Sequence, residues 1–215
     1  MAHISATRDN LTSTSVGIHH SDLIGTGAFR EVYRGTYVGG NRNSQKAACK
    51  KFKLSYRYLE DGFYASDMKI ADQSIKYAEE WNVFCALGRE ITVTRGSFAT
   101  ENGQKWLFEP FINDFTKFTS NNGWIDEHQN TKAMEAFTHF TYHKSGGSQI
   151  VCDIQGRYRP NHPRNRGKSK ARYELTDICS RRRTFGPTDL GEKGIDSFFH
   201  NHICNDYCNA NGKKW

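Results

Sequence analysis

A short segment near the C-terminus contains three residues that bind soft metal ions, His202, Cys204 and Cys208. Their spacing, His-x-Cys-x-x-x-Cys, brings one imidazole and two thiols within reach of a tetrahedral Zn²⁺ ion. The fourth ligand must come from elsewhere, and His139 in AFTHFTYH is a candidate, although a single histidine among apolar residues is more often a hydrogen-bonded core residue. With four protein ligands no coordination position stays open, so we expect this zinc to be structural rather than catalytic.

The segment IVCDIQG ends a hydrophobic run with a carboxylate and an amide, Asp153 and Gln155. Side chains two residues apart on a strand point to the same face of a sheet. Together, the two groups can orient a hydroxyl and bind Mg²⁺ through oxygen atoms. A second acid, Asp177 in YELTDIC, could complete the magnesium site. The D-x-Q pattern is unspecific when it stands alone.

A glycine-rich turn lies between two runs of β-type residues in GTGAFREVYRG. Gly25 and Gly27 would let backbone N–H groups approach phosphate oxygens without obstruction by side chains. They could also simply form a hairpin, because glycine commonly marks turns. Arg30 follows the turn, where its guanidinium could supply positive charge to the phosphates.

Lys50 lies near the end of the apolar segment AACKKFK, downstream of the glycine turn. This is the arrangement that holds the α- and β-phosphates of a nucleotide. Of the three lysines Lys50, Lys51 and Lys53, alternation along a strand places Lys51 on the face opposite to Lys50. Lys50 follows the apolar run most closely and is our candidate, whereas the alternative is that all three lysines are solvated strand residues.

The elements that must position these residues begin with three predicted antiparallel strands. One lies on each side of the turn in LIGTGAFREVYRGTYVG, and the third is in AACKKFKL. A helix is predicted from Ser66, with Gly88 at its C-terminal end. Its apolar residues recur every three or four positions, at Met68, Ala71, Ile75, Ala78, Trp81, Phe84 and Cys85. Strands near REITVTRGSF and KWLFEPF complete a predicted five-stranded lobe.

After a connection in NDFTKFTSNNGW, the pattern predicts a second lobe and a hinge near Glu109–Lys117. Its expected elements are a helix around Thr131–His139, a strand in SQIVCDIQG, a basic loop, and a final helix from about Glu192 to Cys204. The loop, residues 157–174, contains Arg157, Arg159, Arg164, Arg166, Lys168, Lys170 and Arg172 against one acid, Glu174. It could be a solvated loop without a function, or it could attract an acidic or phosphorylated substrate.

The composition limits the classes of protein to consider. The chain has 215 residues, 36% hydrophobic and 13% aromatic, which is typical of a folded protein. Its net charge of +7 favours acidic partners but is too small to indicate nucleic-acid binding. No apolar run approaches the ~20 residues of a membrane span, and MAHISATRDN lacks the apolar core of a secretory signal. We therefore expect a soluble cytoplasmic protein without a membrane partner or a disulfide framework.

Taken together, these segments resemble the alpha-kinases, a family of atypical serine/threonine protein kinases. Motifs of that family occur here in its order: GAFREVYRG, CKKF, FEPFINDFTKFTSNNG, AFTHFTYHKSGG, IVCDIQG, LTD and FGPTDLGEKGIDSFFHNHICNDYC. The similarity extends from about Asp22 to Cys208, nearly the whole chain. GAFR or DIQG alone would be unspecific, but the combination is highly specific. The span from Gln155 to Asp177 is longer than the family usually has.

The resemblance implies catalytic roles for individual residues. Asp153 resembles the catalytic aspartate of the family, and Lys50 resembles its phosphate-binding lysine. Gln155 and Asp177 resemble the magnesium ligands. A carboxylate on the predicted helix should pair with Lys50. Three residues remain open for that role: Asp72, Glu79 and Glu80.

The resemblance also implies a nucleotide site and a zinc site. Glu109 in FEPF resembles the hinge residue whose region binds adenine, and Lys117 in FTKF matches a family position near the nucleotide. Gly191 and Gly194 belong to a glycine-rich segment beside the active site. The nucleotide-binding set is then Gly25, Gly27, Ala28, Phe29, Arg30, Lys50, Glu109, Lys117, Gly191 and Gly194. The residues that match the family's structural zinc site are His139, His202, Cys204 and Cys208.

We therefore expect an α+β, two-lobed atypical protein kinase fold with a structural zinc site in the C-terminal lobe. Residues 1–20 are expected as a polar leader or a short edge element, 21–112 as the N-lobe and 113–215 as the C-lobe. The expected function is transfer of the ATP γ-phosphate to a serine or threonine of a protein substrate, with Mg²⁺ and structural Zn²⁺.

Two alternatives remain open. The first is a pseudokinase that binds ATP without transferring its phosphate. The second is a zinc-stabilised nucleic-acid-binding module that uses the basic loop. This module would explain the charge and the metal ligands, but not Lys50, Glu109 and Asp153 in that order. The sequence does not indicate an oligomeric state.

Overall fold

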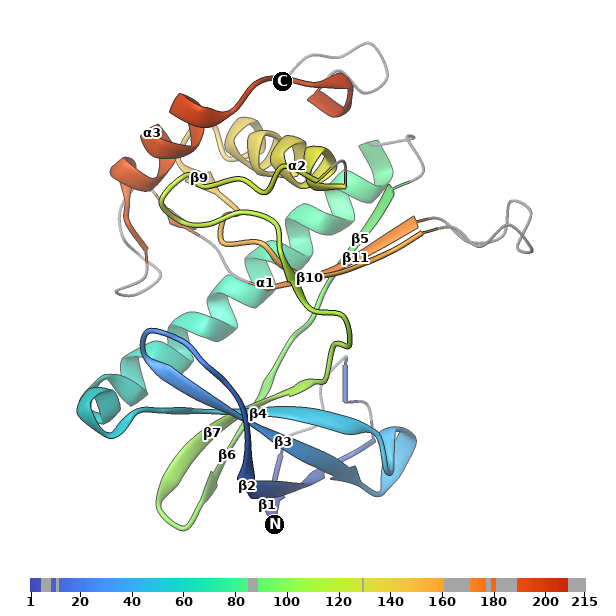
Figure 1. The fold of residues 1–215 in the computed structure, drawn as a ribbon, viewed down its shortest axis with the longest axis vertical. Helices are drawn as coiled ribbons and strands as arrows, with labels where there is room; N and C mark the ends of the chain where they lie inside the picture. The colour runs from blue at the N-terminus through green and yellow to red at the C-terminus, as the bar shows by residue number, and fades with distance from the viewer. Residues whose placement is uncertain are drawn as a thin grey trace. The chain divides into compact units, whose positions relative to one another are not determined.

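The structure, a computed structural model, describes residues 1–4, 9–10, 12–84, 89–128, 130–160, 171–176, 179–180 and 189–208. Two compact units divide the chain, and Figure 1 traces their elements. The first contains Met1–Met68 and Thr94–Ile112, and the second contains Lys69–Val93 and Asn113–Trp215. Residues 69–93, expected in the N-lobe, therefore group with the second unit, because their apolar side chains belong to its core.

The first unit is built on a six-stranded antiparallel sheet in the order β1-β2-β3-β4-β7-β6. Its strands are β1 (Ala2–His3), β2 (Ser15–Thr26), β3 (Arg30–Val38), β4 (Lys46–Phe52), β6 (Ser97–Glu101) and β7 (Gln104–Pro110). Two short 3₁₀ helices, η1 (Gly40–Arg42) and η2 (Leu54–Leu59), follow β3 and β4. The prediction of three antiparallel strands around the glycine turn and Lys50 is confirmed by β2, β3 and β4.

Residues 1–20 contribute to this sheet rather than forming a loose leader. β1 pairs with β2 at the edge of the sheet, with Ala2 opposite Val16. Ala2, Ile4 and Val16 are all buried in a core cluster of the first unit. Their burial explains why a segment that is polar on average is ordered at its apolar positions.

The prediction of a five-stranded lobe that includes all of REITVTRGSF is wrong. The run REITVTRGSF forms two strands in different sheets, β5 (Arg89–Val93) in the second unit and β6 in the first. Between them, the backbone N–H of Arg95 donates to the carboxylate of Asp9, 2.6 Å away. Gly96 passes so close to β7 that a Cβ atom there would lie 2.4 Å from a side-chain carbon of Leu107. These contacts break the strand in two.

The two faces of the first sheet carry different clusters. Trp106 and Phe108 belong to one cluster, whereas Leu107 belongs to another with Phe52. Alternation therefore places Lys50 on the face of Phe52 and Leu107, because Lys50 pairs with Leu107 in register. Lys51 lies on the opposite face, with its Nζ 4.9 Å from the ring centre of Tyr33. The predicted separation of Lys50 from Lys51 is confirmed.

Helix α1 (Glu60–Phe84) begins earlier than the predicted start at Ser66. Glu60 and Asp61 occupy its first turn, where acidic side chains interact favourably with the helix dipole. Phe63 and Tyr64, in the same stretch, pack in the cluster that contains Phe52. The predicted helix end at Gly88 lies outside the described residues.

The second unit combines a four-stranded sheet, in the order β5-β11-β10-β8, with a two-stranded sheet of β12 and β9. Its remaining strands are β8 (Thr116–Lys117), β9 (Gln149–Ile150), β10 (Gln155–Arg159), β11 (Ala171–Thr176) and β12 (Cys179–Ser180). Its other helices are α2 (Thr131–Lys144) and α3 (Glu192–Asn201). Trp81 of α1 contacts Phe137 and Phe140 of α2 edge to face, so the two helices share one core (Figure 1).

The predicted basic loop is partly a hairpin. Residues 155–159 in β10 pair antiparallel with residues 172–176 in β11, and Arg157 lies opposite Glu174. Residues 161–170 lie outside the described part of the chain. A sequence rich in arginine therefore forms strands here, because Tyr173 is fully buried and anchors β11 in the core of the second unit.

Cysteine usage differs from the expectation at one position. Cys49 and Cys152 are buried, as predicted. Cys152 takes part in a disulfide, however, whose partner lies outside the described side chains. Among the described residues, every helix is too short or too polar to span a lipid bilayer.

Candidate active site

Lys50 and Glu109 form an ion pair on the inner strands of the first sheet. Ala48 of β4 is the register partner of Glu109 on β7, so Lys50, two residues further, is a diagonal neighbour of Glu109 on the same face. Nζ of Lys50 lies 2.5 Å from Oε2 of Glu109, and both side chains are largely buried. One partner of Lys50 is therefore a strand carboxylate. Of the three helix carboxylates expected as candidates, Glu80 pairs with Lys144.

The predicted glycine turn joins β2 to β3 and is exposed at Gly27 and Ala28. The N–H of Gly27 donates to the carbonyl of Arg30, 2.8 Å away, which closes the turn. The ring of Phe29 packs on Tyr56 and Phe63. The turn is thus anchored at one side and open to solvent at its tip.

Arg30 is held by groups of its own unit. Its Nη2 lies 2.5 Å from Oδ2 of Asp67 on α1, and both side chains are less than one-fifth exposed. Its guanidinium carbon lies 4.6 Å from the ring centre of Phe52, a favourable cation–π distance. Burial raises the pKa of the Asp67 carboxyl above its usual value, and the charge of Arg30 offsets part of that rise. In this conformation the charge of Arg30 stabilises α1 against the sheet.

We expect Arg30→Ala to lower the free energy of unfolding by about 3 kcal/mol, because it leaves a buried carboxylate without its partner. Thermal and denaturant unfolding of the purified chain measure the change. Arg34→Ala is the matched control, since Arg34 pairs with Asp22 at 2.7 Å where the side chains are 30% and 42% exposed. That pair should contribute about 1 kcal/mol or less. Equal losses in both variants would contradict a buried role for Arg30.

Asp153, Gln155 and Lys117 form a second cluster, in the second unit. Lys117 of β8 and Gln155 of β10 are register partners, so their side chains lie next to each other. Nζ of Lys117 is 2.6 Å from Oδ1 of Asp153, and Nε2 of Gln155 donates to Oδ2 of Asp153 at 2.9 Å. Both carboxylate oxygens of Asp153 are thus held in place.

The backbone at Asp153 departs from the predicted strand. β9 ends at Ile150, β10 begins at Gln155, and Asp153 between them has φ 53°, in the left-handed region. Such a conformation costs about 1–3 kcal/mol in a residue other than glycine and persists only where its surroundings enforce it.

Three threonine hydroxyls stabilise this break, because they form hydrogen bonds with backbone groups that a neighbouring strand would otherwise bind. Thr138 donates to the carbonyl of Val151 at 2.7 Å. The N–H of Val151 donates to Thr141 at 2.9 Å, and the N–H of Ile154 donates to Thr119 at 3.0 Å. Sequence reasoning missed these residues, although the two threonines of AFTHFTYH on the buried face of α2 were a visible signal.

The remaining predicted site residues are placed as follows. Gly191 precedes α3 with φ 64°, and its N–H donates to Oδ1 of the buried Asp189 at 2.9 Å. Gly194 is buried in the first turn of α3, with its N–H directed at the carbonyl of Gly191. Asp177 lies outside the described residues. The structure therefore brings together Lys117, Asp153 and Gln155, but it does not test Asp177 as a metal ligand.

His139, His202, Cys204 and Cys208 gather in the second unit, with donor atoms all within 4.8 Å of one another. α3 ends at Asn201, earlier than predicted. His202 and Cys204 follow it in an irregular segment, and Cys208 lies in a short 3₁₀ turn. Nε2 of His202 is 3.2 Å from Nδ1 of His139 and 3.6 Å from Sγ of Cys208. Sγ of Cys204 is 3.7 Å from Nδ1 of His139.

These separations fit a tetrahedral zinc site. Zn–N bonds of about 2.05 Å and Zn–S bonds of about 2.3 Å put nitrogen pairs about 3.3 Å apart and nitrogen–sulfur pairs about 3.6 Å apart. The three distances given above match these edges, and the remaining pairs of donor atoms lie within 4.8 Å of each other. In the absence of a cation, burial raises the pKa of the Cys208 thiol to about 11, and a bound zinc ion would favour the thiolate.

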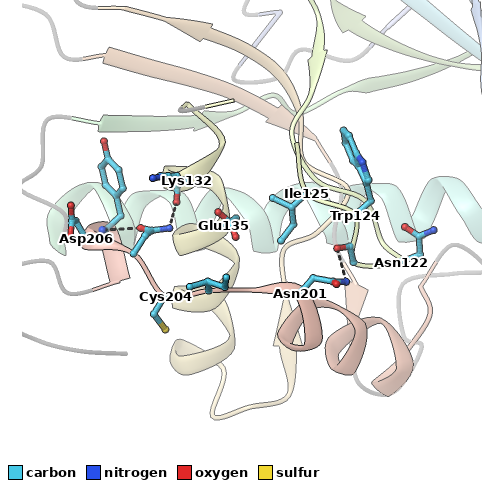
Figure 2. A pocket seen from close by; sticks show the side chains of 12 residues that line it. Asn122, Trp124, Ile125, Lys132, Glu135, Asn201, Cys204 and Asp206 are labelled. Atoms are coloured by element: carbon cyan, nitrogen blue, oxygen red, sulfur yellow. Dashed lines mark hydrogen bonds between the residues drawn. The ribbon is translucent and has the colours of Figure 1, made fainter. Parts of the chain in front are cut away.

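A cavity of about 930 Å³ lies beside this cluster, with Cys204 and Glu135 in its wall (Figure 2). Residues 122–125, Lys132 and Glu135 of α2, Asn201 and residues 203–207 line it. Trp124 and Ile203 give it apolar walls, and both side chains are at least half exposed.

A model of the alpha-kinase family matches residues 25–208. The chain belongs to the alpha-kinase family. The fold of this chain is similar to that of the alpha-kinase domain of myosin-II heavy chain kinase A in complex with AMP-PNP, with a TM-score of 0.73 at 21% sequence identity. That match covers 94% of this chain and 89% of the other. The predicted α+β kinase fold is confirmed.

Two relatives show how far the alpha-kinase similarity extends. Alpha-protein kinase vwkA of Dictyostelium discoideum is 30% identical over 187 residues, 82% of this chain. Eukaryotic elongation factor 2 kinase of Rattus norvegicus is 26% identical over 201 residues, 89% of this chain. This chain spans 26% of the length of each of these relatives.

Proposed function

We propose that this chain is the catalytic domain of a serine/threonine protein kinase that transfers the γ-phosphate of ATP to a protein hydroxyl. The observation that carries the proposal is the pair of clusters in an alpha-kinase fold, Lys50 with Glu109 and Asp153 with Lys117 and Gln155. Phosphoryl transfer depends mainly on positioning and on electrostatic stabilisation of the transferred group. Each cluster supplies, within its own unit, fixed charges of both signs.

The first cluster is proposed to bind the nucleotide. The phosphates would lie under the exposed turn at Gly27–Arg30, and Lys50 would hold the α- and β-phosphates. Glu109 would keep the amine of Lys50 on the face of the sheet that carries Phe52 and Leu107 until phosphate oxygens replace the carboxylate. Complexes of myosin heavy chain kinase A with AMP, ADP and AMP-PNP support nucleotide binding by this fold.

The second cluster is proposed to activate the substrate hydroxyl. Asp153 would orient the serine or threonine and accept its proton as the oxygen attacks the γ-phosphorus. Lys117 keeps one oxygen of Asp153 in place, while Gln155 fixes the other. Gln155 and Asp177 are the proposed holders of Mg²⁺, which neutralises charge on the phosphates when bound.

The His139, His202, Cys204 and Cys208 cluster is proposed to bind structural Zn²⁺. His139 lies on α2, and the other three ligands follow α3. The metal would therefore tie two distant segments of the second unit together and contribute directly to its folding.

Lys50→Ala is expected to lower phosphoryl transfer from Mg²⁺-ATP to serine and threonine peptides by at least about 10²-fold, because the phosphates lose a positioned charge. Lys53→Ala is the matched control, since it removes the same charge from a neighbouring position, and it should keep activity within about twofold. Transfer of radiolabelled phosphate to a peptide array measures both variants. Activity of Lys50→Ala within a few-fold of the unaltered chain would contradict the assignment. ATP binding without transfer by the unaltered chain would instead indicate a pseudokinase.

A further inference from the structure

Glu135 lies against the proposed zinc ligands without being one of them. It is on α2, one turn before His139, and its Oε1 is 3.3 Å from Nδ1 of His202. The side chain of His202 is 2% exposed and that of Glu135 is 14% exposed. A largely buried carboxylate therefore faces the ring nitrogen of a buried histidine.

The two histidines present different ring nitrogens to the centre of the cluster. His202 directs Nε2 at His139 and Cys208, whereas His139 directs Nδ1 at His202 and Cys204. A zinc ion at this centre would bind Nε2 of His202. A neutral imidazole that binds a metal through Nε2 must carry its proton on Nδ1, which is the nitrogen that faces Glu135.

We propose that Glu135 is a positioning residue for the zinc site, an inference that rests on the zinc site proposed above. Its carboxylate accepts the hydrogen bond of Nδ1–H of His202 and fixes the tautomer that offers Nε2 to the metal. A carboxylate behind a metal-bound histidine also makes the imidazole a stronger donor, which typically raises metal affinity about 10–100-fold.

The surroundings of His202 complete this arrangement. Its ring stacks on Phe198 of α3, with ring centres 4.9 Å apart and planes at 16°. Stacking fixes the plane of the ring, and Glu135 selects which nitrogen carries the proton. The cavity beside α2 has both Glu135 and Cys204 in its wall (Figure 2), so Cys204 is accessible from the cavity in the folded protein.

The test measures zinc affinity by competition with chelators of graded strength on the purified chain. Glu135→Ala should raise the zinc dissociation constant about 10–100-fold. Glu135→Gln should raise it less, because the amide oxygen still accepts the Nδ1–H hydrogen bond but carries no charge. Glu127→Gln is the matched control on an exposed glutamate, and its zinc affinity should equal that of the unaltered chain.

A second readout reports the tautomer directly. In the zinc-loaded, ¹⁵N-labelled chain, the NMR signals of His202 should show a proton on Nδ1, and those of His139 a proton on Nε2. Glu135→Gln keeps the shape of the side chain, so this readout remains available if Glu135→Ala fails to fold.

The outcomes separate the two proposals. An unaltered chain that binds no zinc overturns the zinc site itself. An unaltered chain that binds one zinc, with Glu135→Ala and Glu135→Gln both within about twofold of its affinity, overturns the role of Glu135 alone. A proton on Nε2 of zinc-bound His202 also overturns it.

Discussion

Asp153→Asn is expected to lower the rate of phosphoryl transfer by about 10²–10⁴-fold while leaving ATP binding within a few-fold of the unaltered chain. The amide keeps the shape of the side chain but cannot accept the proton of the attacking hydroxyl. Asparagine also tolerates the left-handed backbone at this position, where φ is 53°. The variant should therefore fold normally, and its defect should lie in turnover. Single-turnover transfer measures the rate, and equilibrium titration measures ATP binding.

Asp114→Asn provides the matched control for this variant. Asp114 also has a left-handed backbone, with φ 54°, and its side chain is exposed. Its replacement makes the same chemical change outside the proposed cluster and should leave the rate unchanged. Normal turnover in Asp153→Asn would rule out Asp153 as the base. A loss of ATP affinity without a loss of maximal rate would assign Asp153 to the metal instead.

Loss of one zinc ligand should have the largest effect on stability. Cys208 is fully buried, and zinc binding by a closed four-ligand site contributes about 10–16 kcal/mol in small zinc domains. That exceeds or equals the whole stability of most domains, about 5–15 kcal/mol. We therefore expect Cys208→Ser and His139→Ala to give insoluble or unfolded protein without bound zinc. Elemental analysis and circular dichroism measure the two properties.

A neighbouring histidine controls for the zinc prediction. His200, on α3, is exposed and is not a member of the ligand cluster. His200→Ala should retain one zinc per chain and the stability of the unaltered protein. A soluble and fully active Cys204→Ala/Cys208→Ala double variant would contradict a structural zinc site, as would the absence of zinc in the unaltered chain.

Local patterns predicted several residues that the structure gathers in the candidate clusters. The spacing of His202, Cys204 and Cys208 is a property of one short segment, and strand alternation separates Lys50 from Lys51 whatever the rest of the fold does. Both predictions therefore depended on short-range geometry. The helices α1 and α2 were predicted in the correct places, but with ends displaced, because their first or last turns are set by tertiary contacts and dipole effects.

The features that could not be predicted from the sequence depend on contacts between residues far apart along the chain. Glu109 meets Lys50 only because β4 and β7 are adjacent in the sheet. The break at Asp153 depends on hydroxyls of α2 and of residue Thr119, far away in the sequence. β5 pairs in parallel with β11, residues 171–176, and no local pattern distinguishes that pairing from an antiparallel one with β6.

Direct measurement of phosphate transfer tests the central proposal most sharply. The purified chain is incubated with Mg²⁺ and γ-labelled ATP in the presence of a serine and threonine peptide library, and the labelled amino acid is identified after hydrolysis. We expect label on serine or threonine, dependent on Mg²⁺ and abolished in Asp153→Asn. ATP that binds in a Lys50-dependent manner but transfers no label to any hydroxyl would contradict the proposed kinase activity.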